Sequence, residues 1–386
     1  MKCAIFRIRL EGKGPLVFFE AYLHDERRLL MGKKFHSVIT ICSLVVTALF
    51  LLATGGSAAP MIWKLATSAP DNNITLTAIE GGGLSSEHTV AVVFKKLVEE
   101  RTGRNIQVNI YPNSQLGDEP ELWQQLKDGI IQVSTASCMP LSNFVPQWSA
   151  FMLPYLTNSP EVMYRVLEGP VGEQFKKLTI DKIGVRILGW SFLGFRNFTN
   201  NTRPIRSPAD MKGLKIRVTQ SPEAVKMVEG LGAQATPISW SELYSALQQG
   251  VVDGEENPLS MIEQAKLYEV QKYLTLDGHT LGVLPIAVNE KVFNSLSPEY
   301  KDIVKDSAQQ AIAVFRAQLY LGNTLWIDDL KQKKMQIYVP NAAEYKQFQD
   351  AAQKMVIPYV RSKIGNEWVD KVIKAVKDAE KAYYER

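Results

Sequence analysis

The chain has 386 residues, 46% hydrophobic and 22% charged, a composition typical of a soluble globular protein with room for two domains. Residues 1–58 carry eight of the 44 basic and four of the 40 acidic residues, so the rest of the chain holds 36 of each. The basic excess therefore belongs to the N-terminal segment, and the charge balance argues against a nucleic-acid-binding surface.

An apolar stretch near the N-terminus has the order of a secretory signal peptide. Residues 31–59 run from two lysines into an apolar segment at 38–53 and then into small residues, and we expect cleavage after Ala58 or Ala59. An uncleaved membrane anchor is the alternative, because the apolar segment is only slightly shorter than a membrane span. Cleavage is favoured, since no charged cluster follows that would stop transfer.

Thirty residues stand before this signal peptide, although such a signal normally begins the chain. They show no continuous helical or strand period. We therefore expect translation to begin at Met31, with residues 1–30 an untranslated upstream segment, residues 31–58 the signal peptide, and the mature protein in the periplasm.

Strand-like and helix-like segments then alternate. We expect strands at 74–79, 105–111 and 130–137, with helices at 87–103 and 118–129 between them. Strand, helix and strand at this spacing are typical of βαβ units in an α/β sheet.

The alternation continues to the C-terminus. A helix over 297–334 is long for a globular protein, which indicates that it spans more than one structural unit. Ser221 is expected to cap one helix, and Ser239 with Glu242 has the spacing of a capping box. The other expected elements are a helix over 159–178 broken at Gly169-Pro170, strands at 185–192, 213–220 and 284–293, and helices at 221–232, 239–250 and 367–386.

Few residues suit metal binding or nucleophilic catalysis. Beyond the signal peptide the sequence keeps one cysteine, Cys138, and two histidines, His88 and His279. One cysteine cannot form an internal disulfide, so we expect Cys138 to be a buried thiol. The sequence contains no His/Cys cluster, phosphate-binding glycine loop or GxSxG motif, so we expect no metal, no cofactor and no enzyme activity.

The segment MKGLKIRVTQ, residues 211–220, places an arginine on an alternating strand. Leu214, Ile216 and Val218 share one face, which we expect to meet the core. Arg217 projects from the other face, and the pattern alone leaves open whether that face meets water or a binding site.

Four stretches resemble the substrate-binding proteins of TRAP (tripartite ATP-independent periplasmic) transporters, of the dicarboxylate type. They are residues 110–129, 208–218, 239–258 and 268–274, and their order and spacing fit that family. The resemblance implies an α/β fold of two domains joined by a hinge, with mixed sheets flanked by helices and one long helix that crosses both domains.

The resemblance also implies approximate domain boundaries and a function. Domain I would comprise 60–193 plus 283–322, and domain II 194–282 plus 323–386. The protein would capture a small organic acid, such as a C4-dicarboxylate or a sugar acid, and deliver it to the small and large membrane subunits of a TRAP permease for ion-driven uptake. We expect a monomer, with a dimer as the alternative.

The family's ligand-binding residues fall on four positions of this sequence. Arg217 would form a paired salt bridge with the ligand carboxylate, for which a planar guanidinium is well suited. Arg196 is the counterpart of a second arginine, or else a solvated charge at a strand end. Asn257 would contact the polar end of the ligand, or else serve as a turn residue. Trp240 would pack against the ligand, or else belong to the core.

Two further candidates stand where the sequence departs from parts of the family. Ser137 occupies a position where the sialic-acid binders carry a glutamate, so their polyol contact is not expected. Glu80 either accepts hydrogen bonds from ligand hydroxyls or an amine, or faces solvent. We expect His88 to be a partly exposed helix residue, and the role of His279 is open.

Other functions remain as alternatives. A sensor, or a binding protein of another importer, would share the hinged fold. An exported enzyme acting on an organic acid would use Glu255, Glu256 or Glu80 as acid and base. Glu255 and Glu256 would otherwise pair with the arginines in the empty cleft or stay in water.

Overall fold

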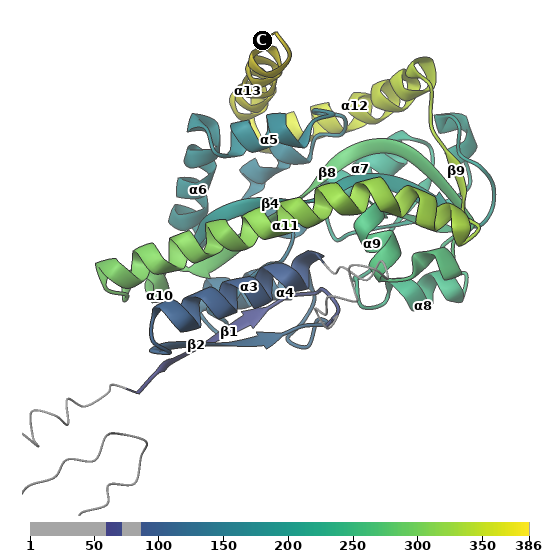
Figure 1. Ribbon diagram of the computed structural model, residues 1–386. Coiled ribbons are helices and arrows are strands. Elements are labelled where there is room, and N and C mark those ends of the chain that lie inside the picture. The colour runs from purple at the N-terminus through teal and green to yellow at the C-terminus, as the bar shows by residue number, and fades with distance from the viewer. Residues whose placement is uncertain (1–58, 72–85, 386) are drawn as a thin grey trace, which may run out of the picture. The chain divides into compact units, whose positions relative to one another are not determined.

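The computed structural model describes residues 59–71 and 86–385 (Figure 1). The expected signal peptide, the start at Met31, the strand at 74–79 and the candidate Glu80 lie outside these residues. Within the described part of the chain, no helix combines the length and the apolar character needed to cross a membrane.

A mixed nine-stranded sheet forms the centre of the described chain. Its strands are β1 (Met61–Ala66), β2 (Ile106–Tyr111), β3 (Val133–Ser134), β4 (Val185–Asn200), β5 (Lys215–Val218), β6 (Gln234–Pro237), β7 (Gly254–Pro258), β8 (Tyr273–Asn289) and β9 (Gln336–Tyr338). The strand order is β2-β1-β3-β8-β4-β7-β5-β6, and β9 pairs with β8. The mixed α/β class predicted from the sequence is confirmed.

Two long antiparallel strands, β4 and β8, hold the sheet together. β8 pairs with β3 near its C-terminal end, and β4 pairs with β7 near its own. The two strands pair along most of their length, with three register shifts. We call residues 60–71 and 86–137, which carry β1 to β3, the β1–β3 lobe, and residues 208–258, which carry β5 to β7, the β5–β7 lobe.

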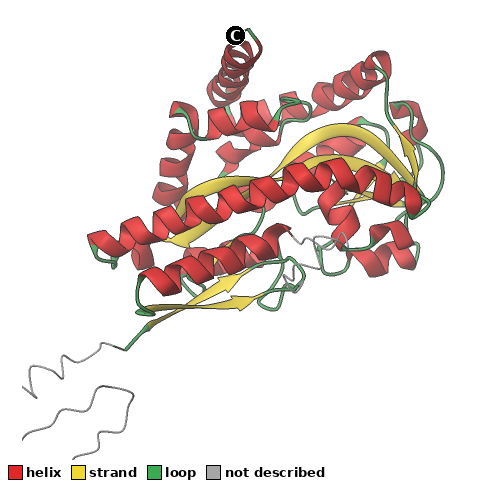
Figure 2. Cartoon of the chain, in the orientation of Figure 1, coloured by secondary structure: helices red, strands yellow, loops and turns green. Residues whose placement is uncertain are grey.

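Helices cover both faces of this sheet (Figure 2). They are α3 (Ser86–Arg101), α4 (Glu119–Asp128), α5 (Pro160–Leu167), α6 (Pro170–Ile183), α7 (Pro222–Gly230), α8 (Leu243–Gln248), α9 (Leu259–Gln264), α10 (Glu290–Asn294), α11 (Pro298–Gln332), α12 (Ala342–Ile364) and α13 (Asn366–Tyr384). Four short 3₁₀ helices are η1 (Met139–Asn143), η2 (Pro146–Met152), η3 (Pro208–Met211) and η4 (Leu267–Glu269).

The 35-residue helix α11 is continuous, as its sequence pattern predicted. It packs against α3 of the β1–β3 lobe, against β4, and against α9, the helix that follows β7 (Figure 1). Gly322 lies buried inside it without breaking it. A Cβ atom at this position would lie 2.4 Å from the ring of Trp326, so the absent side chain makes room for that indole.

Several local predictions are confirmed. The Ser221 side chain accepts a hydrogen bond from the Ala224 amide at the start of α7. Gly169-Pro170 separates α5 from α6, and α4 ends at Gly129 in the left-handed conformation, with φ of 76°. The buried apolar residues form one core along the sheet, which includes Cys138 as expected.

Other predictions are wrong in detail. The Ser239 hydroxyl donates to Glu242, but α8 begins only at Leu243, so the pair closes a turn rather than a capping box. The strand expected over 284–293 ends at Asn289, because the next residues form α10. The strand expected over 130–137 is only the two-residue β3.

His88 is also more buried than expected. His88 belongs to α3 and its side chain is buried, with Nε2 3.2 Å from the Asp71 carboxylate. Burial lowers the pKa of His88, which Asp71 only partly offsets. The proposed boundaries of domains I and II stay a prediction.

Candidate functional site

A narrow cavity between the two lobes brings together five of the six candidate site residues. These are Ser137, Arg196, Arg217, Trp240 and Asn257. The cavity holds about 350 Å³ not filled by atoms, including its mouth, but the centres of water molecules can occupy only about 30 Å³. That space suits one or two waters, so a larger ligand requires the walls to separate.

Arg217 reaches the cavity from β5. Leu214, Ile216 and Val218 are buried, which confirms their core-facing side, but Arg217 is only 3% exposed as well. Its Nε donates to the Ile238 carbonyl at 2.8 Å, and no ion pair joins it to a carboxylate of the described residues. Burial, and with it the nearby charge of Arg196, lowers the pKa of Arg217 more than the nearby carboxylates raise it. Arg217 is therefore a buried cation without a contacting counter-ion.

Arg196 reaches the cavity from β4 but already has an anion. Its Nε and Nη2 both donate to the Glu256 carboxylate of the neighbouring strand β7, with 2.9 Å from Nη2 to Oε1. Burial disfavours the charged form of both side chains. Their mutual attraction outweighs this effect, so it raises the pKa of Arg196 and holds the pKa of Glu256 at about 2. A solvated arginine at a strand end is therefore wrong for Arg196.

His279, whose role the sequence left open, lies behind this ion pair. Its Nε2 is 3.1 Å from Glu256 Oε2, and its Nδ1 is 2.8 Å from Asp277 Oδ2. Burial would lower the pKa of His279, but the two carboxylates raise it to about 9. A hydrogen bond of 2.9 Å from Tyr155 to Asp277 extends the chain. His279 thus holds Glu256, and through it Arg196, in place.

Glu255 does not pair with an arginine. Its carboxylate accepts from the Thr199 hydroxyl at 2.6 Å and from the Asn257 amide. Burial raises the pKa of Glu255 to about 7, although these hydrogen bonds favour its ionised form. Neither glutamate of this pair faces water: Glu256 neutralises Arg196, and Glu255 orients Asn257.

Trp240 is partly buried, packs against the core and also lines the cavity, and its contact with a ligand stays a prediction. The next residue, Ser241, contacts the other lobe. The Ser241 hydroxyl donates to Asp118 at the start of α4, at 2.6 Å, which joins the β5–β7 lobe to the β1–β3 lobe.

Two acidic residues on the cavity wall, Glu87 and Glu119, were not predicted from the sequence. They lie in the first turns of α3 and α4. Acidic residues are common in such positions because they interact favourably with the helix dipole, so nothing in the sequence separates these two from ordinary helix starts. Glu119 Oε1 accepts a hydrogen bond from the Ser137 amide at 3.0 Å.

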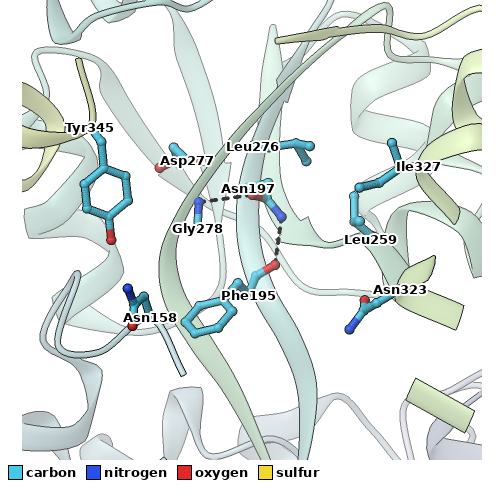
Figure 3. A pocket seen from close by; sticks show the side chains of 10 residues that line it. All are labelled: Asn158, Phe195, Asn197, Leu259, Leu276, Asp277, Gly278, Asn323, Ile327 and Tyr345. Carbon is cyan, nitrogen blue, oxygen red and sulfur yellow. Dashed lines mark hydrogen bonds between the residues drawn. The ribbon is translucent and has the colours of Figure 1, made fainter. Parts of the chain in front are cut away.

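A larger hollow lies on the opposite face of the sheet, where the centres of water molecules can occupy about 350 Å³ (Figure 3). Asn197 lies in its wall, accepting from the Gly278 amide at 3.1 Å and donating to the Phe195 carbonyl at 2.8 Å. Adjacent strand residues face opposite sides, so Asn197 lines this hollow while Arg196 lines the cavity. None of the described residues that line the hollow is basic, which makes it a poor site for an organic anion.

The sequence model of the family described as "Bacterial extracellular solute-binding protein, family 7" matches residues 79–362. The chain belongs to this family. Its members are the solute-binding proteins of TRAP transporters, so the resemblance noted in the sequence is confirmed. Members bind small organic acids, work with TRAP permeases and are periplasmic.

Three relatives show how far the similarity extends. A solute-binding protein of Verminephrobacter eiseniae is 36% identical over 255 residues, which are 66% of this chain and 76% of the relative. The sugar acid binding protein DctPAm of Advenella mimigardefordensis strain DPN7T, solved with galactonate, is 30% identical with a TM-score of 0.76, over 83% of this chain and 99% of that one. A TRAP periplasmic solute binding protein of Polaromonas sp. JS666, bound to D-erythronate, is 28% identical with a TM-score of 0.74, over 81% and 98%.

These solved relatives are two-domain periplasmic binding proteins, so the hinged fold expected for this solute-binding protein is confirmed. They are binding proteins rather than enzymes.

Proposed function

We propose that this solute-binding protein captures a small organic acid with Arg217 and delivers it to the small and large subunits of a TRAP permease. In this proposal the mature protein works in the periplasm as a monomer, after removal of residues 31–58. The observation that carries the proposal is the burial of the Arg217 guanidinium without a carboxylate partner. A buried charge is unfavourable unless it is paired, so a ligand carboxylate would supply the missing anion.

The other candidates take supporting roles in this proposal. Glu256 occupies Nε and Nη2 of Arg196, so Arg196 would meet the ligand through Nη1 and add less charge than Arg217. Asn257, held by Glu255, would contact a polar group of the ligand. Trp240 would cover an apolar face of the ligand, and Ser137 and Glu80 would contact its hydroxyls. The galactonate and D-erythronate in the two solved relatives support an organic acid as ligand.

A thermal-shift screen against a library of organic acids tests the proposal, because a ligand that binds only the native state raises the melting temperature. For the strongest binder, Arg217→Lys should weaken binding at least tenfold by calorimetry, or about 1.4 kcal/mol, since lysine cannot form two parallel hydrogen bonds with a carboxylate. Arg104→Lys is the matched control, because the Arg104 side chain is 73% exposed. Unchanged affinity in Arg217→Lys would remove Arg217 from the site.

A sensor, or a binding protein of another importer, would show the same ligand affinity. Genes for a small and a large membrane subunit beside this one would favour the TRAP assignment over either alternative.

A further inference from the structure

The two walls of the cavity carry opposite charges. Arg196, Arg217 and Asn257 line it from β4, β5 and β7. Glu87 and Glu119 line it from the helix starts of the β1–β3 lobe. A ligand held between these walls therefore meets cations at one end and carboxylates at the other.

Glu87 has an unused acceptor in this wall. The residue is 1% exposed, and Thr67 donates a hydrogen bond to its carboxylate. Its Oε2 is buried and has no hydrogen-bond partner in the described part of the chain. Buried polar atoms of native proteins almost always have a partner, so an unpartnered one in the wall of a binding cavity marks the place for a ligand donor. Burial, and then the charge of Glu119, raise the pKa of Glu87 well above its usual range.

We propose that Glu87, with Glu119, binds the hydroxyl end of a ligand with a single carboxylate, and thereby selects polyhydroxy monocarboxylates over dicarboxylates. This inference rests on the proposed role of Arg217, which fixes the carboxylate at the opposite wall. A second carboxylate would lie in a desolvated space beside the Glu119 carboxylate, where like charges repel strongly, and it would bring no hydrogen-bond donor to the free oxygen of Glu87. A hydroxyl instead donates a hydrogen bond to the free oxygen of Glu87.

A hydroxyl also fits this wall better than an ammonium group does. Ser68, Ser137 and Thr219 line the same cavity, and their hydroxyls can both donate to and accept from a polyol. An ammonium has only donors and needs ionised acceptors, whereas burial favours the neutral form of Glu87.

Calorimetry at pH 7.5 with two pairs of acids tests the selectivity of the wild-type protein. The pairs are D-erythronate with meso-tartrate, and D-galactonate with galactarate. The members of each pair differ only in whether the terminal carbon is a hydroxymethyl or a carboxylate. We expect at least one monocarboxylate to bind tenfold or more tightly than its dicarboxylate. A dicarboxylate that binds as tightly as its partner in both pairs would overturn the inference, as would tighter binding of 4-aminobutanoate than of either monocarboxylate.

Glu87→Gln tests the residue itself. It keeps the size but adds an amide N–H group, from which a second ligand carboxylate can accept a hydrogen bond, so the preference for the monocarboxylate should fall at least fivefold. Glu121→Gln, on the exposed side of α4, is the matched control and should leave that preference unchanged. An unchanged preference in a folded Glu87→Gln protein would assign the selectivity elsewhere. The wild-type comparison does not depend on the variant folding.

The two proposals fail separately. Binding that Arg217→Lys does not weaken contradicts the proposed function, whatever the selectivity. Dicarboxylate binding that is as tight as monocarboxylate binding in both pairs, and that Arg217→Lys weakens, supports the proposed function and contradicts this inference. If no acid of the library binds, both are overturned.

Discussion

The two walls of the cavity differ in how their charges are supported. On the β5–β7 side, Arg196 is held by Glu256, which is held in turn by His279 and Asp277. On the β1–β3 side, Glu87 keeps one oxygen without a partner. Side chains fixed by their neighbours lose little freedom when a ligand arrives, so the basic wall is prepared to orient a carboxylate. The acidic wall depends on the ligand to complete its hydrogen bonds.

Glu256→Gln, which removes the central charge of the basic wall, should have the largest effect on stability. Loss of its charge leaves Arg196 and His279 buried with one anion fewer, so we expect the free energy of unfolding to fall by about 3–5 kcal/mol. Glu255 is the matched control, because it is adjacent, equally buried and bonded only to neutral groups. Urea titration of Glu255→Gln should show a loss below about 1 kcal/mol, since the glutamine oxygen can still accept from Asn257 while its amide donates to Thr199, whose hydroxyl also bonds Gln271. Equal losses would mean that Glu256 is not the centre of the network.

The pH dependence of the free energy of unfolding should report on His279, which belongs to the same network. Its pKa of about 9 in the folded protein exceeds the usual 6.5, so the folded protein binds this proton more tightly than the unfolded chain does. The stabilisation is complete below pH 6.5 and is lost as the pH rises through 9, by about 3 kcal/mol at most.

The measurement is best made above pH 7. The pKa of Glu255 is raised to about 7, so the protein also loses stability through Glu255 as the pH rises from 4.5 to 7. Urea unfolding at several values from pH 7 to pH 9 should show a decline in the wild type. His279→Gln should be nearly flat over that range. A decline of equal size in both proteins would assign it to other groups.

Ser241→Ala should have the smallest effect. It removes the side-chain hydrogen bond to Asp118 that joins the two lobes. The bond is exposed, so we expect ligand affinity to fall only two- to fivefold, through faster dissociation in stopped-flow measurements. Ser239→Ala serves as control, because Ser239 bonds only within its own turn. A larger loss in Ser239→Ala would show that the turn matters more than the contact between lobes.

Much of the fold was predictable because its signals are local. Helix starts and ends at Ser221, Gly129 and Gly169-Pro170, and the length of α11, follow from capping residues and apolar spacing. β1, β6, β7, β9 and α12 were not among the elements predicted from the sequence. β7 reads GEENP, a polar segment that resembles a loop, and it is nonetheless fully buried. It forms a central strand because Arg196, His279 and Thr199 satisfy its carboxylates, and these partners are remote in sequence.

Some residues of the candidate site were also predictable from the sequence, and others were not. Arg217, Arg196, Asn257 and Trp240 follow from the family resemblance, because the alternating strand alone leaves open whether Arg217 meets water or a ligand. Glu87 does not stand out, because its burial depends on the packing of α3 against distant segments. A single sequence cannot separate a glutamate that stabilises a helix start from one that also faces a ligand.

The long strands and the long helix have a mechanical consequence. β4, β8 and α11 continue from one lobe to the other without an intervening loop, so opening the cavity bends regular secondary structure. Strands bend most readily at bulges, and one of the three register shifts lies between Arg196 and Phe198, beside the ion pair with Glu256. Opening would therefore place elastic strain on β4, β8 and α11, and closure of the walls around the acid would relieve that strain.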